Sequence, residues 1–196
     1  MYVNHDFSWS LCVLAENNYR LITLPENARL RIQEGKKSRV SQFGNYTTYG
    51  CIYFQKEAPI LVRRSPMLDN PEEATKLQRD ANEFYVTQNQ LEQAIDSGYY
   101  ELPFKRFKDK GLIALLLIPT DRFKDEGITV FTFGTTEGRD LRQDEKDAEE
   151  YGLFLREAGI NEIPVILIKT HYYLDEPRRP HVMQLWFDGL NNNSGL

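Results

Sequence analysis

Two apolar runs separated by an acidic helical segment constrain the fold of this chain more than any other feature. Residues 128–134 (ITVFTFG) and 164–169 (PVILIK) have the length and composition of buried strands, and residues 140–158 carry apolar side chains at helical spacing. This order is typical of a β-α-β unit with a right-handed crossover between parallel strands. Ligands tend to bind beyond the carboxyl ends of such strands. The loop there provides candidate ligand-binding residues Thr135, Thr136 and Arg139, and the candidate catalytic residue Asp140.

The loop after residue 134 is compatible with several kinds of chemistry. Backbone amides at the helix start, two threonine hydroxyls and one arginine could hold a phosphate. Glu137 and Asp140 would repel an anion and can cap the helix themselves, or hold a divalent cation together with Asp144. We favour an ordinary capped connection, and we expect the acids of residues 144–150 on a solvated helix face.

Length and composition indicate a folded, globular chain. The 196 residues suffice for one well-buried core, and the apolar (41%) and charged (27%) shares are those of globular proteins. We expect a single domain over residues 1–190, with any subdivision near residues 64–70, and a disordered tail at residues 191–196.

The charge and the chain start indicate a soluble cytoplasmic protein. A net charge of -5 disfavours nucleic acid and anionic membranes as partners. The first residues lack the pattern of a signal peptide, and the apolar run at residues 112–119 is too short to cross a bilayer. Cys12 and Cys51 lie in apolar runs, so we expect buried free thiols rather than a disulfide.

The first third of the chain has the pattern of antiparallel strands. Residues 9–14 and 19–24 alternate around a turn and predict a hairpin. Three further runs have strand composition and are separated by turn residues. They cover residues 29–33, 46–55 and 60–63.

The middle of the chain predicts two helices. Asn70 and Pro71 form a helix start, Thr87 and Gln90 have the spacing of a capping box, and Gly98 ends the second helix. Residues 112–119 then predict a central strand. Together these patterns predict an α+β fold: a mixed sheet with antiparallel N-terminal strands, central helices and a C-terminal β-α-β-β unit.

The C-terminal segment offers a second candidate site. If residues 170–174 pair with residues 181–183, His171 and His181 come close and are candidate catalytic residues, with Arg178 and Arg179 as candidate ligand-binding residues. Pairing does not place both histidines on one side, and a metal needs at least three ligands. We favour surface or half-buried histidines beside a solvated turn, and we expect no metal and no cofactor.

The sequence leaves two classes of function open. It contains no phosphate-loop, dinucleotide, nucleophile-elbow or zinc-binding motif, so whether the chain is an enzyme is undecided. Aromatic residues gather in residues 46–54 and 185–187 and suit a partner surface. The leading hypothesis is a cytosolic protein-binding or regulatory module with a protein partner or a homodimeric state. The alternative is an enzyme acting on a phosphate-containing or nucleic-acid substrate at the end of the β-α-β unit.

Overall fold

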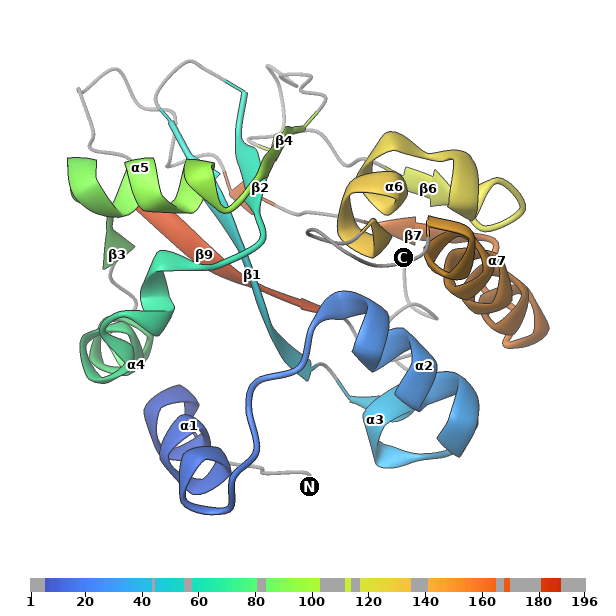
Figure 1. Cartoon of the computed structure of the whole chain (residues 1–196), viewed down its shortest axis with the longest axis horizontal. Helices are drawn as coiled ribbons and strands as arrows, with labels where there is room; N and C mark the ends of the chain where they lie inside the picture. Colours follow the sequence, from blue (N-terminus) through green and yellow to red (C-terminus); the bar gives the residue numbers. More distant parts are fainter. Residues whose placement is uncertain are drawn as a thin grey trace. The chain divides into compact units, whose positions relative to one another are not determined.

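The chain folds into two compact units. The computed structural model describes residues 6–43, 45–54, 58–80, 84–102, 112–113, 117–134, 141–164, 168–169 and 181–187. In these ranges it has seven α-helices, two short 3-10 helices and short strands, which makes the fold an α+β fold (Figure 1). Unit 1 comprises Met1–Thr23, Tyr46–Glu101 and Pro177–Phe187, and unit 2 comprises Leu24–Asn45, Leu102–Glu176 and Asp188–Leu196. Residues 64–70, where we expected any subdivision, lie within unit 1.

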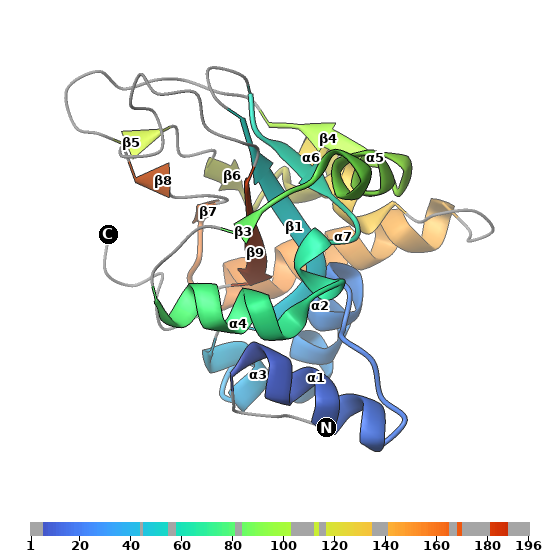
Figure 2. The ribbon, with the colours of Figure 1, turned by 90° about the vertical axis from the view of Figure 1, so that its left-hand side faces the viewer.

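Unit 1 is built on a five-stranded sheet. Its strand order is β3-β9-β1-β2-β4, and β1 and β9 lie side by side near its centre (Figure 2). The antiparallel register places Cys51 opposite Leu61 and Leu61 opposite Tyr100. The predicted strands at residues 46–55 and 60–63 are confirmed. The strands are β1 (Asn45–Tyr53), β2 (Ile60–Val62), β3 (Phe84–Tyr85), β4 (Tyr99–Glu101) and β9 (His181–Phe187).

Two helices of unit 1 begin where local capping chemistry predicts. The Asn70 side chain accepts from the Glu73 amide at the start of α4 (Pro71–Arg79), and Thr87 and Gln90 form the predicted capping box of α5 (Gln88–Asp96). Gly98 has a φ of 99°, which suits glycine at the end of a helix. The core side chains of the unit come from strands and helices alike. They include Phe7, Ile52, Val62, Met67, Ala74, Phe84, Val86 and Ala94.

The predicted hairpin at residues 9–24 is wrong. Its first half is α1 (Phe7–Glu16), and residues 19–23 form neither helix nor strand. Asp6 caps the helix by accepting from the Trp9 amide. Phe7 is buried and Leu11 packs against the core, which is helical spacing. Alternation and helical spacing coincide in a short apolar run, and here the packing favours the helix.

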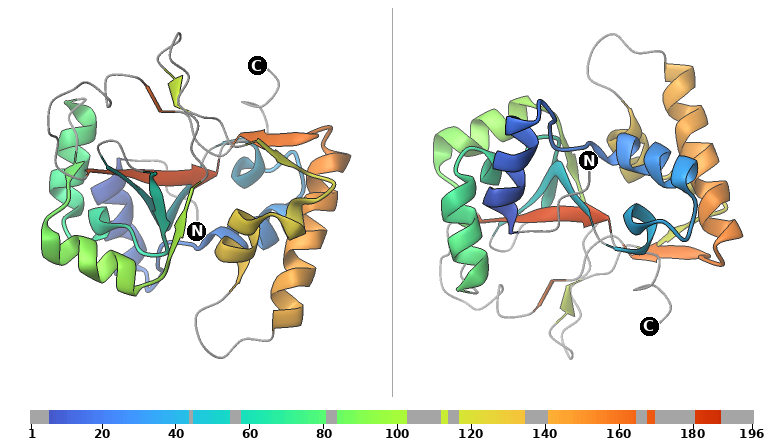
Figure 3. Two further views of the ribbon diagram at one scale, coloured as in Figure 1. Left: turned by 90° about the horizontal axis from the view of Figure 1, so that it is seen from above. Right: turned by 90° about the horizontal axis from the view of Figure 1, so that it is seen from below.

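Unit 2 combines helices with two small antiparallel sheets. The sheets pair β5 with β8 and β6 with β7. The helix α2 replaces the strand predicted at residues 29–33, and it packs beside α7 (Figure 3). The α-helices are α2 (Leu24–Glu34), α3 (Arg39–Gln42), α6 (Gly127–Phe133) and α7 (Leu141–Glu157). The 3-10 helices of the chain are η1 (Pro66–Leu68) in unit 1 and η2 (Phe123–Asp125) in unit 2. The strands of unit 2 are β5 (Leu112–Ile113), β6 (Leu117–Pro119), β7 (Glu162–Pro164) and β8 (Ile168–Lys169).

The predicted β-α-β unit is also wrong, because residues 128–134 do not form a strand. Residues 128–133 belong to α6 and Gly134 is its C-cap, and the buried residues Ile128, Thr129, Thr132 and Phe133 have helical spacing. The Phe133 ring packs edge-on against Phe123, with ring centroids 5.6 Å apart. The chain therefore passes from β6 to β7 through α6 and α7, and these two strands pair antiparallel. Residues 135–140, which lie outside the described residues, therefore follow a helix rather than a strand, and the argument that placed a ligand there no longer holds.

A buried arginine organises the core of unit 2. Arg31 is 1% exposed. Its Nε donates to the Val40 carbonyl oxygen at 2.9 Å, and its Nη2 donates to the Phe43 carbonyl oxygen at 3.3 Å. Its Nη1 donates to the Tyr151 hydroxyl oxygen at 3.1 Å. Burial raises the pKa of Tyr151, although Arg31 acts in the opposite direction, so Tyr151 stays a neutral phenol at neutral pH.

Two acids of α7 lie in this interior, contrary to the expected solvated face. Asp144 is 5% exposed and Asp147 is 3% exposed. Asp147 pairs with Arg29 at 3.3 Å and accepts from the Gln143 amide at 2.8 Å. Asp144 lies four residues before the buried Ala148, and Asp147 lies four residues before the buried Tyr151, so each acid shares a side of the helix with a core residue.

We expect Tyr151→Phe to destabilise unit 2. The change keeps the ring but removes the oxygen that accepts from Arg31, so a buried donor loses a partner. The free energy of unfolding should fall by about 1–3 kcal/mol. Urea denaturation followed by circular dichroism measures this fall. Tyr99→Phe, at an exposed tyrosine, is the matched control, and equal stability of both variants would contradict this role of the hydroxyl.

Candidate interaction surface

Most of the predicted site residues lie outside the described residues. His181 is the exception: in β9 its backbone lies opposite Tyr85 of β3, whereas we had expected residues 170–174 as its partner. The other candidates are therefore not brought together by any described contact, and their roles stay predictions. These residues are Thr135, Thr136, Arg139, Asp140, His171, Arg178 and Arg179.

The first predicted aromatic surface is part of the core of unit 1. Tyr49 is 4% exposed and Tyr53 is 2% exposed. Tyr46 is half-buried, and its ring packs edge-on against Phe7 at a centroid distance of 5.3 Å. An interaction surface at residues 46–53 is therefore wrong. The second aromatic run belongs to β9, which lies between β3 and β1 inside the sheet rather than at its edge.

A different aromatic residue is exposed, on α1. This helix carries no charged side chain before Glu16. One side of it, with Phe7, Ser10 and Leu11, is turned toward the core of unit 1. The opposite side is exposed and is called here the outer face of α1. It consists of Trp9, Cys12 and Glu16, at spacings of three and four residues, with the half-buried Val13 beside them.

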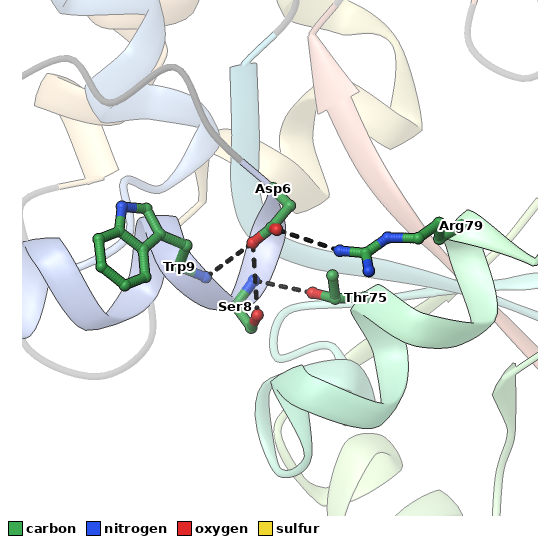
Figure 4. Close-up of polar contacts among 5 residues, drawn as sticks. All are labelled: Asp6, Ser8, Trp9, Thr75 and Arg79. Atoms are coloured by element: carbon green, nitrogen blue, oxygen red, sulfur yellow. Dashed lines mark hydrogen bonds and ion pairs between the residues drawn. The ribbon is translucent and has the colours of Figure 1, made fainter.

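Polar contacts tie α1 to α4. The Asp6 carboxylate accepts from the Trp9 amide at 3.0 Å, and the Ser8 amide donates to the Thr75 hydroxyl oxygen at 2.8 Å. Arg79 pairs with Asp6 at 3.4 Å. Figure 4 shows these contacts gathered at the first turn of α1, with the Trp9 indole extending away from them. Trp9 is 55% exposed, and these contacts fix the backbone that carries its indole.

The electrostatics at this first turn depend on Asp6. Burial raises the pKa of Tyr46, and the negative charge of Asp6 raises it further. The same carboxylate lies at the positive end of the α1 dipole, where an acid is stabilising. A single side chain thus caps the helix, pairs with Arg79 of α4 and adds to the rise in the pKa of Tyr46 that burial causes.

The sequence contains a signal for this surface that our strand interpretation missed. Asp6 is followed three residues later by Trp9, the spacing between an N-cap and the amide it binds. The apolar residues after it fit helical spacing as well as alternation. Exposure of Trp9, however, depends on what packs around α1, and no local pattern reports that.

Two surface depressions have polar lining groups that are engaged within the protein. One in unit 2 has a volume of about 680 Å³, and there Arg156 donates to the Thr120 carbonyl oxygen while the Thr120 hydroxyl donates to the Ile160 carbonyl oxygen. One in unit 1 has a volume of about 250 Å³, and Arg64 pairs there with Asp69 at 2.6 Å.

Two further properties hold for the part of the chain that the structure describes. No three His, Cys, Asp or Glu side chains gather there as ligands for a metal ion. None of the helices there combines the length and the apolar composition needed to cross a bilayer.

The fold is similar to that of a solved structure described as "Accommodation of massive sequence variation in Nanoarchaeota by the C-type lectin fold". The TM-score is 0.60 at 17% sequence identity, and the match covers 97% of this chain and 86% of that chain. At this identity the likeness shows the fold alone. The sequence matches no family model and no curated protein.

We expect Asp6→Ala to destabilise unit 1 by about 1 kcal/mol, within the usual range for a lost N-cap. Arg79→Ala should cost less, since both partners of this pair are well exposed and such pairs contribute little. Thermal unfolding of both variants provides the comparison. Asp6→Asn keeps a capping oxygen and serves as the control. A loss on Asp6→Asn as large as on Asp6→Ala would show that the cap is not the stabilising contact.

The two free thiols should react at very different rates. Cys12 is exposed and Cys51 is buried, and burial raises the pKa of Cys51 to about 12. At pH 8 the Cys51 thiol is therefore protonated as well as shielded, whereas reaction requires an accessible thiolate. A thiol reagent should label one cysteine per folded chain, at Cys12, and two in denaturant. Mass spectrometry of the labelled peptides assigns the sites, and rapid native labelling of Cys51 would contradict the burial.

Proposed function

We propose that this chain is a protein-binding module that holds its partner on the outer face of α1. The observation that carries the proposal is the exposed Trp9 indole on a helix tied to α4. A tryptophan buries a large area when a partner covers it, and tryptophans are over-represented among the residues that dominate binding energy. Because α1 is already fixed, binding would cost little conformational entropy.

The composition of α1 supports the same proposal. A surface helix normally has a polar outer side, whereas α1 has Trp9 and Cys12 there and its only charged residue at its last position, Glu16. Exposed apolar surface on a fixed element marks a place where a partner can bind.

The structural likeness is compatible with a binding role. The similar structure is described as an accommodation of massive sequence variation by the C-type lectin fold. A fold that accommodates variation suits recognition of different partners, since the scaffold persists while surface residues change. For this chain we infer a cytoplasmic, binding or regulatory role, and its two free cysteines suit a reducing compartment.

We expect Trp9→Ser to weaken partner binding at least tenfold while leaving the unfolding temperature nearly unchanged. The indole is largely exposed in the free protein, so its loss removes contact area in the complex rather than in the core. The partner is first identified by photo-crosslinking from a benzoylphenylalanine placed at position 9. Its affinity for the original and variant proteins is then measured by calorimetry with purified components.

Tyr19→Ser is the matched control, because Tyr19 is a similarly exposed aromatic residue of unit 1 outside α1. Its affinity should equal that of the original protein. Equal affinities for Trp9→Ser and the original protein would refute the proposal.

A further inference from the structure

The outermost strand of the sheet of unit 1 has an open side. Among the described strands, β4 ends the strand order and pairs with β2 alone. Tyr99 is 53% exposed, and Glu101 is exposed as well. Natural proteins commonly block such an edge with a proline, a lysine or a bulge. The three residues of β4 include neither proline nor lysine, and their register with β2 is regular.

This register decides which backbone groups of β4 face outward. Along an antiparallel pair, residues that exchange hydrogen bonds alternate with residues whose N–H and C=O groups point away from the neighbouring strand. The Arg63 amide donates to the Gly98 carbonyl oxygen at 3.3 Å, so the bonded residue of β4 is Tyr100, two positions further on. Tyr99 and Glu101 therefore turn their N–H and C=O groups to the open side. Within the part of the chain that the structure describes, no hydrogen bond reaches these four groups.

The four outward groups specify the shape of what binds them. Those of Tyr99 lie about 7 Å along the strand from those of Glu101, which is the spacing of alternate residues in an extended chain. A helix is a poor match, because its own N–H and C=O groups are already bonded to each other.

The side chains of β4 specify the composition of the same segment. An aromatic or β-branched residue suits the position opposite Tyr99, since such pairs stabilise neighbouring strands. Opposite Glu101, a lysine or arginine is favourable and an acid is repelled.

We propose that the open edge of β4 binds an extended peptide segment of a partner protein as an additional antiparallel strand, with a basic residue of that segment opposite Glu101. The other pairs of this sheet with a described register are antiparallel too. Recognition of this kind draws its affinity from main-chain hydrogen bonds and its selectivity from alternate side chains. Because β4 and α1 are different elements, this site is additional to the outer face of α1.

A peptide library tests the composition of the bound segment on the full chain. Its members are blocked seven-residue peptides with threonine at alternate positions and the other positions randomised, and we expect selection of a peptide that contains lysine or arginine. Replacing this basic residue with glutamate should weaken binding about fivefold. Glu101→Lys should reverse the preference. Glu34→Lys, the same change at an exposed glutamate of unit 2, is the matched control and should leave the preference unchanged.

Amide exchange, followed residue by residue by NMR, tests the pairing. In the free protein the Tyr100 amide should exchange slowly and the amides of Tyr99 and Glu101 rapidly. The selected peptide should slow exchange at Tyr99 and Glu101 at least fivefold. N-methylation of the peptide at its basic residue, whose amide faces β4, should abolish binding. N-methylation of the next amide, which points away from β4, is the control and should be tolerated.

The possible outcomes separate this site from the surface on α1. A library without a binding peptide, or a bound peptide that leaves the amides of Tyr99 and Glu101 unprotected, overturns the proposal. Protection of these amides in the protein alone, rising with its concentration, would identify a second copy as the occupant and also overturns it. A preference for basic peptides that Glu101→Lys leaves unchanged overturns the role of Glu101. Trp9→Ser should not change the affinity for the peptide, so either site can fail its test while the other passes.

Discussion

The contact between the Asp6 carboxylate and its neighbours is the interaction on which the candidate surface depends. Asp6 accepts from the Trp9 amide and pairs with Arg79, and the adjacent Ser8 amide donates to Thr75. These contacts start the helix at a fixed point on α4. Together with the packing of Phe7 in the core, these contacts orient α1 so that Trp9 is exposed.

Unit 2 shows a comparable arrangement in its interior. Arg31 joins α2 to α7 through Tyr151 and to the segment around α3 through the Val40 and Phe43 carbonyl oxygens. A buried guanidinium is costly unless its donors find acceptors, so this network fixes the packing of three segments at once. In each unit, a few directed polar contacts position helices whose apolar packing alone would tolerate several arrangements.

The sequence predicts local structure correctly where the interactions that form it lie within a few residues of one another. Asn70 and Thr87 mark the starts of two helices, because each has a capping partner three residues later. The strands at residues 46–55 and 60–63 are predicted by their content of β-branched and aromatic residues. The runs at residues 9–14 and 128–134 also carry β-branched and aromatic residues, but packing of Phe7 and Phe133 made them helices. The surface at Trp9 could not be predicted, because exposure is set by distant segments that no local pattern reports.

Hydrogen–deuterium exchange over residues 7–16, with and without a bound partner, tests the central claim most directly. The account predicts amides protected as in a stable helix, with a further slowing of exchange in α1 when the partner binds. Exchange at the rate of an unstructured segment would contradict the fixed helix. Unchanged exchange in α1, with slowing at another segment, would contradict its role as the binding surface.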